Sequence, residues 1–250
     1  MIHSFLLIGQ SNMAGRGFVN EVEPIKNPRV KVLRNGRWQE MYVPVNCDRS
    51  FSGISLAESF ADMYVKEKDV EVGLIPCADG GTSLSQWCEG GLLFDNALYQ
   101  AELASRTSNI AGVLWHQGES DCAEHLYPQY EQKLIKILDA LQKKLNLYDV
   151  PIILGGLGDF LKNSKWDENL KNYTYINDSL KRIAAGRKMT GFVSAEGLDA
   201  NPDNLHFSAQ ALREFGKRYY EVFCGLEDKN KVFVDKDDQD NAIRTKMELL

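Results

Sequence analysis

A serine follows the first apolar run of the chain, in a turn that is rich in glycine. The run ends at Gly9, and Ser11 is followed within a few residues by Gly15 and Gly17. A serine hydroxyl becomes a nucleophile only when a neighbouring base takes its proton, and a tight turn after a strand exposes the hydroxyl to a substrate. The turn therefore fits three roles: a nucleophilic serine, a loop that cradles phosphate, or a helix cap.

The residues around Ser11 match no common motif for phosphate binding or hydrolysis. Met13 occupies the position of the second glycine of a G-x-S-x-G nucleophile elbow. Residues 9–17 contain no Gly-Lys-Ser/Thr, so they do not form a Walker loop, and the GxGxxG dinucleotide pattern is also missing. A nucleophilic serine and a capping turn remain as the two interpretations.

The base that would activate Ser11 has to come from the four histidines of the chain. His206 follows Asp203 by three residues, on a turn just before a helical pattern. At this spacing an aspartate can accept a hydrogen bond from Nδ1 and direct Nε2 outward. An isolated D-x-x-H often occurs by chance, but a serine after a strand of the same sheet favours a functional pair. We expect His3 to be structural and His125 to be exposed.

Donors for a developing oxyanion are available in several loops. The backbone amides of Ser11 and of the pair Gly80 and Gly81 are candidates, because glycine lets a backbone approach a ligand closely. The side-chain amide of Gln117 could supply another donor. The alternatives are a loop hinge at the two glycines and a turn satisfied by Gln117.

Metal and cysteine chemistry have weaker support. His116, Glu119 and Asp121 are close in sequence but lack a ligand spacing such as H-E-x-x-H, so we expect no metal and no other cofactor. Cys77 and Cys122 lie in the same polar loops, but neither has a histidine partner in the sequence. Free cysteines are most often buried as small apolar groups.

The elements that must position these residues alternate along the chain. We expect five buried strands, at residues 4–8, 70–75, 110–115, 151–154 and 191–194. Helical periodicity occurs between and after them, at residues 54–65, 130–145 and 212–222. Ser55 with Glu58 predicts a capping box, and Ser208 predicts a helix cap. The alternation predicts a three-layer α/β/α sandwich, flavodoxin-like, with a central parallel sheet of about five strands.

Polar loops follow four of these strands. They span residues 9–12, 77–87, 116–121 and 196–208. Because ligands bind outside the carboxyl ends of parallel strands, we expect the four loops to share one edge of the sheet. Trp87 and Trp115 flank the loops; core packing is the default for both, although an exposed Trp87 could stack on a sugar.

Composition limits the class of protein. The chain has 250 residues and a formal net charge of −6, which argues against a nucleic acid partner and against an anionic membrane surface. The five cysteines show no paired spacing, and neither a signal peptide nor a membrane span is recognisable. These features predict a cytoplasmic protein with its cysteines reduced.

The sequence predicts a single domain. We expect this domain to span residues 1–226, with an insertion at 18–49 that contains a small hairpin turning at Asn35 and Gly36. Residues 227–250 are rich in charge and form a C-terminal extension of unassigned role. The oligomeric state is not defined by the sequence.

Taken together, the motifs resemble the SGNH-hydrolase superfamily. Within it they are most similar to the branch that holds carbohydrate esterase family six, which is related to acetylxylan esterases, and the sialate O-acetylesterase-like proteins. The resemblance covers roughly residues 4–220. It rests on four blocks, at residues 9–15, 80–83 with Trp87, 115–121 and 203–207.

The resemblance implies Ser11 as the nucleophile, His206 as the base and Asp203 as the residue that orients it. It also implies an oxyanion hole formed by the amide of Ser11, by Gly81 or else Gly80, and by Gln117. Most members of the wider superfamily carry an asparagine at the position of this glutamine. Further substrate-binding or supporting residues are Gln10, Asn12, Arg16, Trp87 and Glu119, and Glu119 either supports His206 or braces its own loop.

The implied activity is that of a serine esterase. It would remove O-acetyl groups from small carbohydrates, such as acetylated xylo-oligosaccharides or sialic acid-type sugars, through an acetyl-enzyme and without a metal. Two alternatives stay open: an SGNH acyl hydrolase that acts on a lipid or a thioester, and a non-catalytic sugar-binding protein on the same fold.

Overall fold

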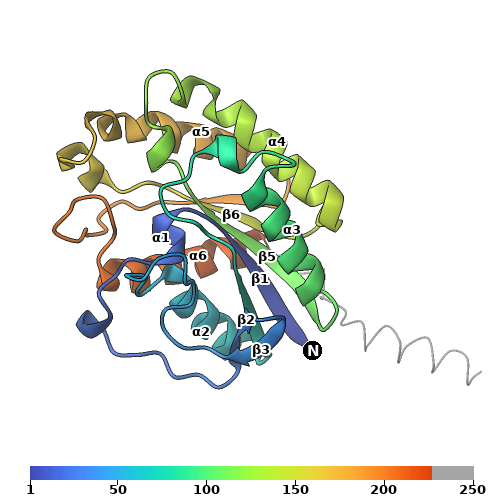
Figure 1. Cartoon of the computed structure of the whole chain (residues 1–250). Helices are drawn as coiled ribbons and strands as arrows, with labels where there is room; N and C mark the ends of the chain where they lie inside the picture. Colours follow the sequence, from blue (N-terminus) through green and yellow to red (C-terminus); the bar gives the residue numbers. More distant parts are fainter. Residues whose placement is uncertain (227–250) are drawn as a thin grey trace, which may run out of the picture.

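The structure, a computed structural model that describes residues 1–226, contains one seven-stranded sheet between two layers of helices (Figure 1). The strands lie in the order β3-β2-β4-β1-β5-β6-β7. They are β1 (Ile2–Gly9), β2 (Val30–Arg34), β3 (Arg37–Glu40), β4 (Val72–Pro76), β5 (Ser108–His116), β6 (Ile152–Gly155) and β7 (Thr190–Val193). The predicted three-layer sandwich is confirmed. The predicted charged extension lies outside the described residues.

Helices cover both faces of the sheet (Figure 1). One face carries α2 (Leu56–Lys68) and α6 (Ala209–Leu226). The other carries α3 (Leu92–Ala104), α4 (Tyr127–Leu145) and α5 (Tyr173–Gly186). Within residues 1–226, no helix combines the length and the apolar character that crossing a membrane requires.

The central strand β1 contributes to both apolar cores. Phe5 and Leu7 pack into the core beneath α2 and α6, whereas Leu6 and Ile8 pack into the core on the opposite face. Successive side chains of a strand point to opposite faces, so a strand covered on both sides is apolar throughout. This explains the continuous apolar run that ends at Gly9.

The predicted helix caps are present. The Ser55 side chain accepts a hydrogen bond from the amide of Ala57, and Glu58 accepts one from the amide of Ser55, which completes a capping box at the start of α2. Ser208 accepts a hydrogen bond from the amide of Ala211 at the start of α6. These caps satisfy amides that a helix leaves without an internal partner.

The sheet has more strands than predicted. The hairpin in the 18–49 segment turns at Asn35 and Gly36, with φ of +50° and +72°, as its sequence indicates. Its strands β2 and β3 join the main sheet, because β2 pairs in parallel with β4. The expected parallel sheet of about five strands is therefore a mixed sheet, with an antiparallel edge. Charged residues interrupt the apolar pattern of both strands, and β3, which forms the edge of the sheet, has no buried residue.

Candidate active site

Ser11 stands at the carboxyl end of β1, where the chain turns into the short helix α1 (Ser11–Ala14). The turn requires glycine at position 9, because a Cβ there would lie 2.0 Å from the carbonyl oxygen of His116 on the neighbouring strand β5. The amide of Gln10 donates to the same carbonyl, at 2.9 Å. The end of β5 therefore fixes the backbone just before Ser11.

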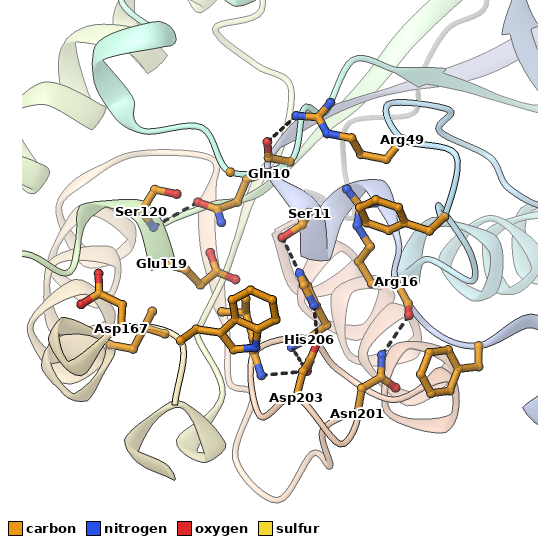
Figure 2. Close-up of a pocket in the computed structure, with 17 residues that line it drawn as sticks. Gln10, Ser11, Arg16, Arg49, Glu119, Ser120, Asp167, Asn201, Asp203 and His206 are labelled. Carbon is orange, nitrogen blue, oxygen red and sulfur yellow. Dashed lines mark hydrogen bonds and ion pairs between the residues drawn. The ribbon is translucent and has the colours of Figure 1, made fainter. Parts of the chain in front are cut away.

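Ser11, His206 and Asp203 form a continuous line of contacts (Figure 2). Nε2 of His206 lies 3.0 Å from Oγ of Ser11, and Nδ1 lies 2.7 Å from Oδ2 of Asp203. The other carboxylate oxygen of Asp203 accepts the amides of Leu205 and His206, at 2.9 and 3.0 Å. The loop that carries the aspartate thus also fixes its direction toward the imidazole.

The charge state of Asp203 sets the imidazole tautomer. Burial on its own raises the pKa of Asp203, but the backbone amides and the side chain of His206 outweigh it, and the pKa lies below its usual value. An ionised carboxylate only accepts hydrogen bonds, so Nδ1 of His206 carries the proton. In the neutral ring Nε2 then has a free lone pair toward Ser11. This arrangement can take the serine proton during attack on an ester.

The two glycines of the predicted oxyanion loop are in different situations. The amide of Gly80 donates to Oδ2 of Asp48, at 2.8 Å, so it is already engaged. Gly81 has φ of +76°, a backbone conformation that favours glycine, and both glycines line the pocket that contains Ser11. In the described part of the chain the Gly81 amide has no partner. Of the two, Gly81 is the free donor.

Arg16 supports this loop through Asp48. Its two terminal nitrogens donate to the two oxygens of Asp48, at 3.1 and 2.6 Å, and both side chains are buried. Burial on its own raises the pKa of Asp48. The hydrogen bonds and charge of Arg16, together with hydrogen bonds from Ser52 and Gly80, lower this pKa by more, so it lies below its ordinary value. Sequence reasoning missed Asp48, since nothing in the 18–49 insertion distinguishes it from other acidic residues there.

Asn12 and Glu119 lie together behind the catalytic candidates. Nδ2 of Asn12 donates to Oε1 of Glu119, at 2.5 Å, and to the carbonyl of Leu205, at 3.2 Å. Oδ1 of Asn12 accepts the amide of Phe207, at 3.1 Å. Glu119 makes no contact with His206 among these interactions. Of the two carboxylates considered for the histidine, Asp203 is therefore the one in contact.

The placement of Gln117 differs from the prediction. Its side chain is fully buried, and Nε2 lies 3.0 Å from the carbonyl of Thr82 and 2.6 Å from Oδ2 of Asp121. An amide nitrogen has only two hydrogens to donate, and both are directed at protein acceptors. Gln117 is also not among the residues that line the pocket. It holds the loop together and does not face a substrate.

Gln10 offers the side-chain amide that Gln117 does not. Oε1 of Gln10 lies within 3.3 Å of Nε2 of Gln117 and 3.4 Å of the amide of Ser120. These contacts hold Oε1 of Gln10 toward Gln117 and Ser120. Nε2 of Gln10 has no hydrogen-bond partner within the described part of the chain. Gln10 lines the pocket next to Ser11 (Figure 2).

Trp87 is a second departure from the predicted site. Its side chain is 1% exposed and packs edge-on against Trp115, at 5.8 Å between ring centroids. Its indole N–H donates to Thr82, at 3.1 Å. Trp87 therefore belongs to the core, and it presents no face to a sugar.

The pocket over Ser11 has a volume of about 630 Å³. Three exposed aromatic side chains, Phe18, Phe51 and Trp166, line its outer part. Sequence reasoning missed them, because an aromatic residue in a loop has no pattern that distinguishes exposure from burial. The volume lies within the range of sites for small ligands.

The other residues considered from the sequence take no part in the contacts around Ser11. Burial raises the pKa of Cys77 to about 12 and also raises that of Cys122, so neither is poised as a thiolate nucleophile. His3 contacts the hydroxyl of Tyr64 at 2.9 Å, in a structural role, and His125 is exposed. Among residues 1–226, no group of three or more His, Cys, Asp or Glu side chains is arranged to hold a metal ion.

Comparison with known proteins relates this geometry to a family. The family model described as "Carbohydrate esterase, sialic acid-specific acetylesterase" matches residues 1–225. A protein of Arabidopsis thaliana described as a probable carbohydrate esterase is 29% identical over 249 residues, which cover 88% of this chain and 91% of that protein.

Solved structures resemble the whole described chain. The X-ray structure of a protein from the same Arabidopsis thaliana locus superimposes with a TM-score of 0.79 at 27% identity, over 89% of this chain and 98% of that one. A carbohydrate acetylesterase from Xanthomonas citri superimposes with a TM-score of 0.67 at 15% identity, over 89% of this chain and 57% of that one. At this lower identity, the likeness concerns the fold.

Proposed function

The chain belongs to the carbohydrate esterase family of sialic acid-specific acetylesterases, and from this premise we propose that it is a serine esterase that removes O-acetyl groups from carbohydrates. One observation carries the proposal: the line of contacts from Asp203 through His206 to Ser11, which ends in the pocket. A serine without such an aligned base and carboxylate would stay a weak nucleophile.

The proposed reaction begins at Ser11. Nε2 of His206 takes the hydroxyl proton while Oγ attacks the acetyl carbonyl carbon, and the carbonyl oxygen becomes an oxyanion. The amides of Ser11 and Gly81 stabilise it by hydrogen bonds that strengthen as the charge develops. When the intermediate collapses, the bond to the sugar oxygen breaks, and His206 returns the proton to that oxygen. The sugar leaves with a free hydroxyl, and the acetyl group stays on Ser11.

Water completes the cycle by the same steps. His206 takes a proton from a water molecule, the hydroxide attacks the acetyl carbon, and acetate leaves as the proton returns to Oγ of Ser11. Asp203 stabilises the imidazolium that forms in both halves of the reaction. Gln10 is our candidate for a third oxyanion donor, because its amide nitrogen is free and lies in the pocket.

Measurements of acyl-chain preference separate this proposal from the lipid or thioester alternative. A pocket suited to acetyl rejects longer groups by crowding, whereas a lipase-like cleft gains binding energy from each added methylene. We expect kcat/KM to fall from acetate to butyrate to octanoate esters of the same aryl alcohol. A rise along the series would overturn the proposal in favour of a lipid or thioester.

Release of acetate from acetylated xylo-oligosaccharides tests the carbohydrate part. The wild type should release acetate, and Ser11→Ala should release none above the buffer rate. A folded wild-type protein that binds the sugar without releasing acetate would instead be a sugar-binding protein.

A further inference from the structure

The cations of the pocket are already paired with protein oxygens. Arg16 and Arg49 are the arginines and lysines that line it in the described part of the chain. Both terminal nitrogens of Arg16 donate to Asp48. Those of Arg49 donate to Asp79, at 2.7 Å, and to the carbonyl of Gly80, at 2.9 Å. Each guanidinium thus already pairs with an aspartate: Arg16 in a buried pair and Arg49 in an exposed one.

Carboxylates, in contrast, are in excess. Glu119, Asp167 and Asp203 line the same pocket, whereas Asp48 and Asp79, which pair with the two arginines, are not among its lining residues. Oε2 of Glu119 is buried without a hydrogen-bond partner in the described part of the chain. Asp167 is exposed at the rim, where one of its oxygens caps the short helix η5 (Glu168–Asn172). A ligand carboxylate would therefore meet a negative potential and no free cation.

The outer wall suits an uncharged ring. Phe51 and Trp166 are 68% and 70% exposed, and each offers an apolar face at the pocket. The C–H faces of a pyranose bury apolar area against such rings, while its hydroxyls can donate to carboxylate oxygens. Asp167, the next residue after Trp166 in the chain, lines the same pocket and carries a carboxylate that can accept such a hydroxyl.

Building on the proposed function, we propose that this pocket selects neutral acetylated saccharides and discriminates against sugars that carry a carboxylate close to the acetyl ester, as acetylated sialic acids do. The paired arginines and the surplus of carboxylates carry this inference. It distinguishes between acetylated xylo-oligosaccharides and sialic acid-type sugars, which the sequence alone does not.

A pair of substrates that differ only in charge tests the proposal. The probes are a 9-O-acetylated sialic acid methyl glycoside and the methyl ester of its carboxyl group, with acetate release as the readout. We expect kcat/KM to be about tenfold higher for the neutral ester, because like charges disfavour binding. The ratio should shrink as salt is raised, since salt screens charges beyond about 8 Å at physiological ionic strength.

The variant Asp167→Asn tests whether the charge of this pocket residue causes the discrimination between the two substrates. Asparagine keeps an oxygen that can cap η5 while it removes the charge, so the ratio between the two substrates should narrow severalfold. The matched control is Glu102→Gln on α3, which makes the same change in net charge. Glu102 is exposed shortly before β5 begins, at the opposite edge of the sheet from the pocket. This control should leave the ratio at its wild-type value.

Hydrolysis of an aryl acetate separates the two possible failures. If the wild type hydrolyses the aryl acetate but cleaves the charged sialic acid as fast as its methyl ester, the charge proposal is overturned and the esterase stands. If it hydrolyses neither the aryl acetate nor the sugars, the esterase itself is overturned. An equal narrowing of the ratio in Glu102→Gln and Asp167→Asn would contradict the role given to the pocket carboxylate.

Discussion

The side-chain amide of Asn12 lies 2.5 Å from Oε1 of Glu119, and this contact joins the turn that carries Ser11 to the loop after β5. The same asparagine holds the backbone on both sides of His206, through the carbonyl of Leu205 and the amide of Phe207. Ser11 and His206, the proposed nucleophile and base, come from opposite ends of the chain. Asn12 is therefore a positioning residue that sets the distance between them.

Removal of the Asn12 side chain should slow the chemical step. In Asn12→Ala the loop of His206 loses two hydrogen bonds, and a misplacement of about 1 Å can cost about 10²-fold in rate. We expect kcat for an aryl acetate to fall by about one to two orders of magnitude, with KM within a few-fold of the wild type. A purely structural role would instead lower the melting temperature and leave kcat per folded molecule unchanged.

Asp203 and Glu119 should differ sharply in their effect on kcat. Asp203→Asn removes the anion that faces the imidazolium, and the comparable change in serine proteases costs about 10⁴ in kcat. Glu119→Gln keeps an oxygen that can accept from Asn12, so we expect a loss of no more than about tenfold. Steady-state kinetics of both variants on one acetylated substrate compare them. If Glu119→Gln lost most of its kcat while Asp203→Asn stayed active, Glu119 and not Asp203 would be the carboxylate that supports His206.

Substitution of Gln117 should lower the stability of the protein, whereas substitution of Gln10 should lower kcat. Gln117→Ala removes one of the two donors to Oδ2 of the buried Asp121 and leaves the amide of Leu84 as the other, which costs about 1–3 kcal/mol of folding free energy. Gln10→Ala removes a donor near Ser11, and the loss of one oxyanion donor costs about 10²–10³ in kcat.

Thermal melts and single-substrate kinetics on both variants separate these effects. A stable Gln117→Ala protein whose kcat has fallen by 10² or more would show that its amide turns toward the oxyanion during turnover.

Asp48 should contribute to stability in a pH-dependent way. Its pKa in the folded protein lies below the ordinary 3.8, so its contribution is fully present above that value and is lost as pH falls through the folded pKa. Asp48→Asn leaves the buried Arg16 unpaired and should cost about 3 kcal/mol near pH 7.

The gap in unfolding free energy between the wild type and Asp48→Asn should stay constant above about pH 4 and narrow as the pH falls below the ordinary aspartate pKa of 3.8. Denaturant unfolding at several pH values measures it. A gap that stays constant as the pH is lowered below 3.8 and through the folded pKa would contradict the ionised Arg16–Asp48 pair.

Much of this site could be predicted from local sequence. The apolar run before Gly9 is buried on both faces because β1 is central, and the D-x-x-H turn holds Asp203 and His206 together within three residues. The residues that were missed or misplaced depend on contacts far apart in the chain. Asp48 reaches the site only because the segment that follows the edge hairpin runs back to Gly80, and no local pattern signals that contact.

Side-chain direction was the other limit of the prediction. Gln117 and Glu119 share one loop, and whether an amide turns toward the core or the pocket is decided by acceptors such as Thr82 and Asp121, which the sequence alone does not place. Trp87 is similar, since its burial follows from packing against Trp115.

The central claim, that Ser11 is the nucleophile, is tested most directly by labelling the intact protein with a fluorophosphonate and mapping the adduct by mass spectrometry. Phosphonylation requires a serine activated by a base. We predict a single adduct on Ser11, lost in His206→Ala when that variant is folded. An adduct on Ser120, the other serine among the described residues that line the pocket, would contradict the assignment. So would an unlabelled Ser11 in a preparation that releases acetate.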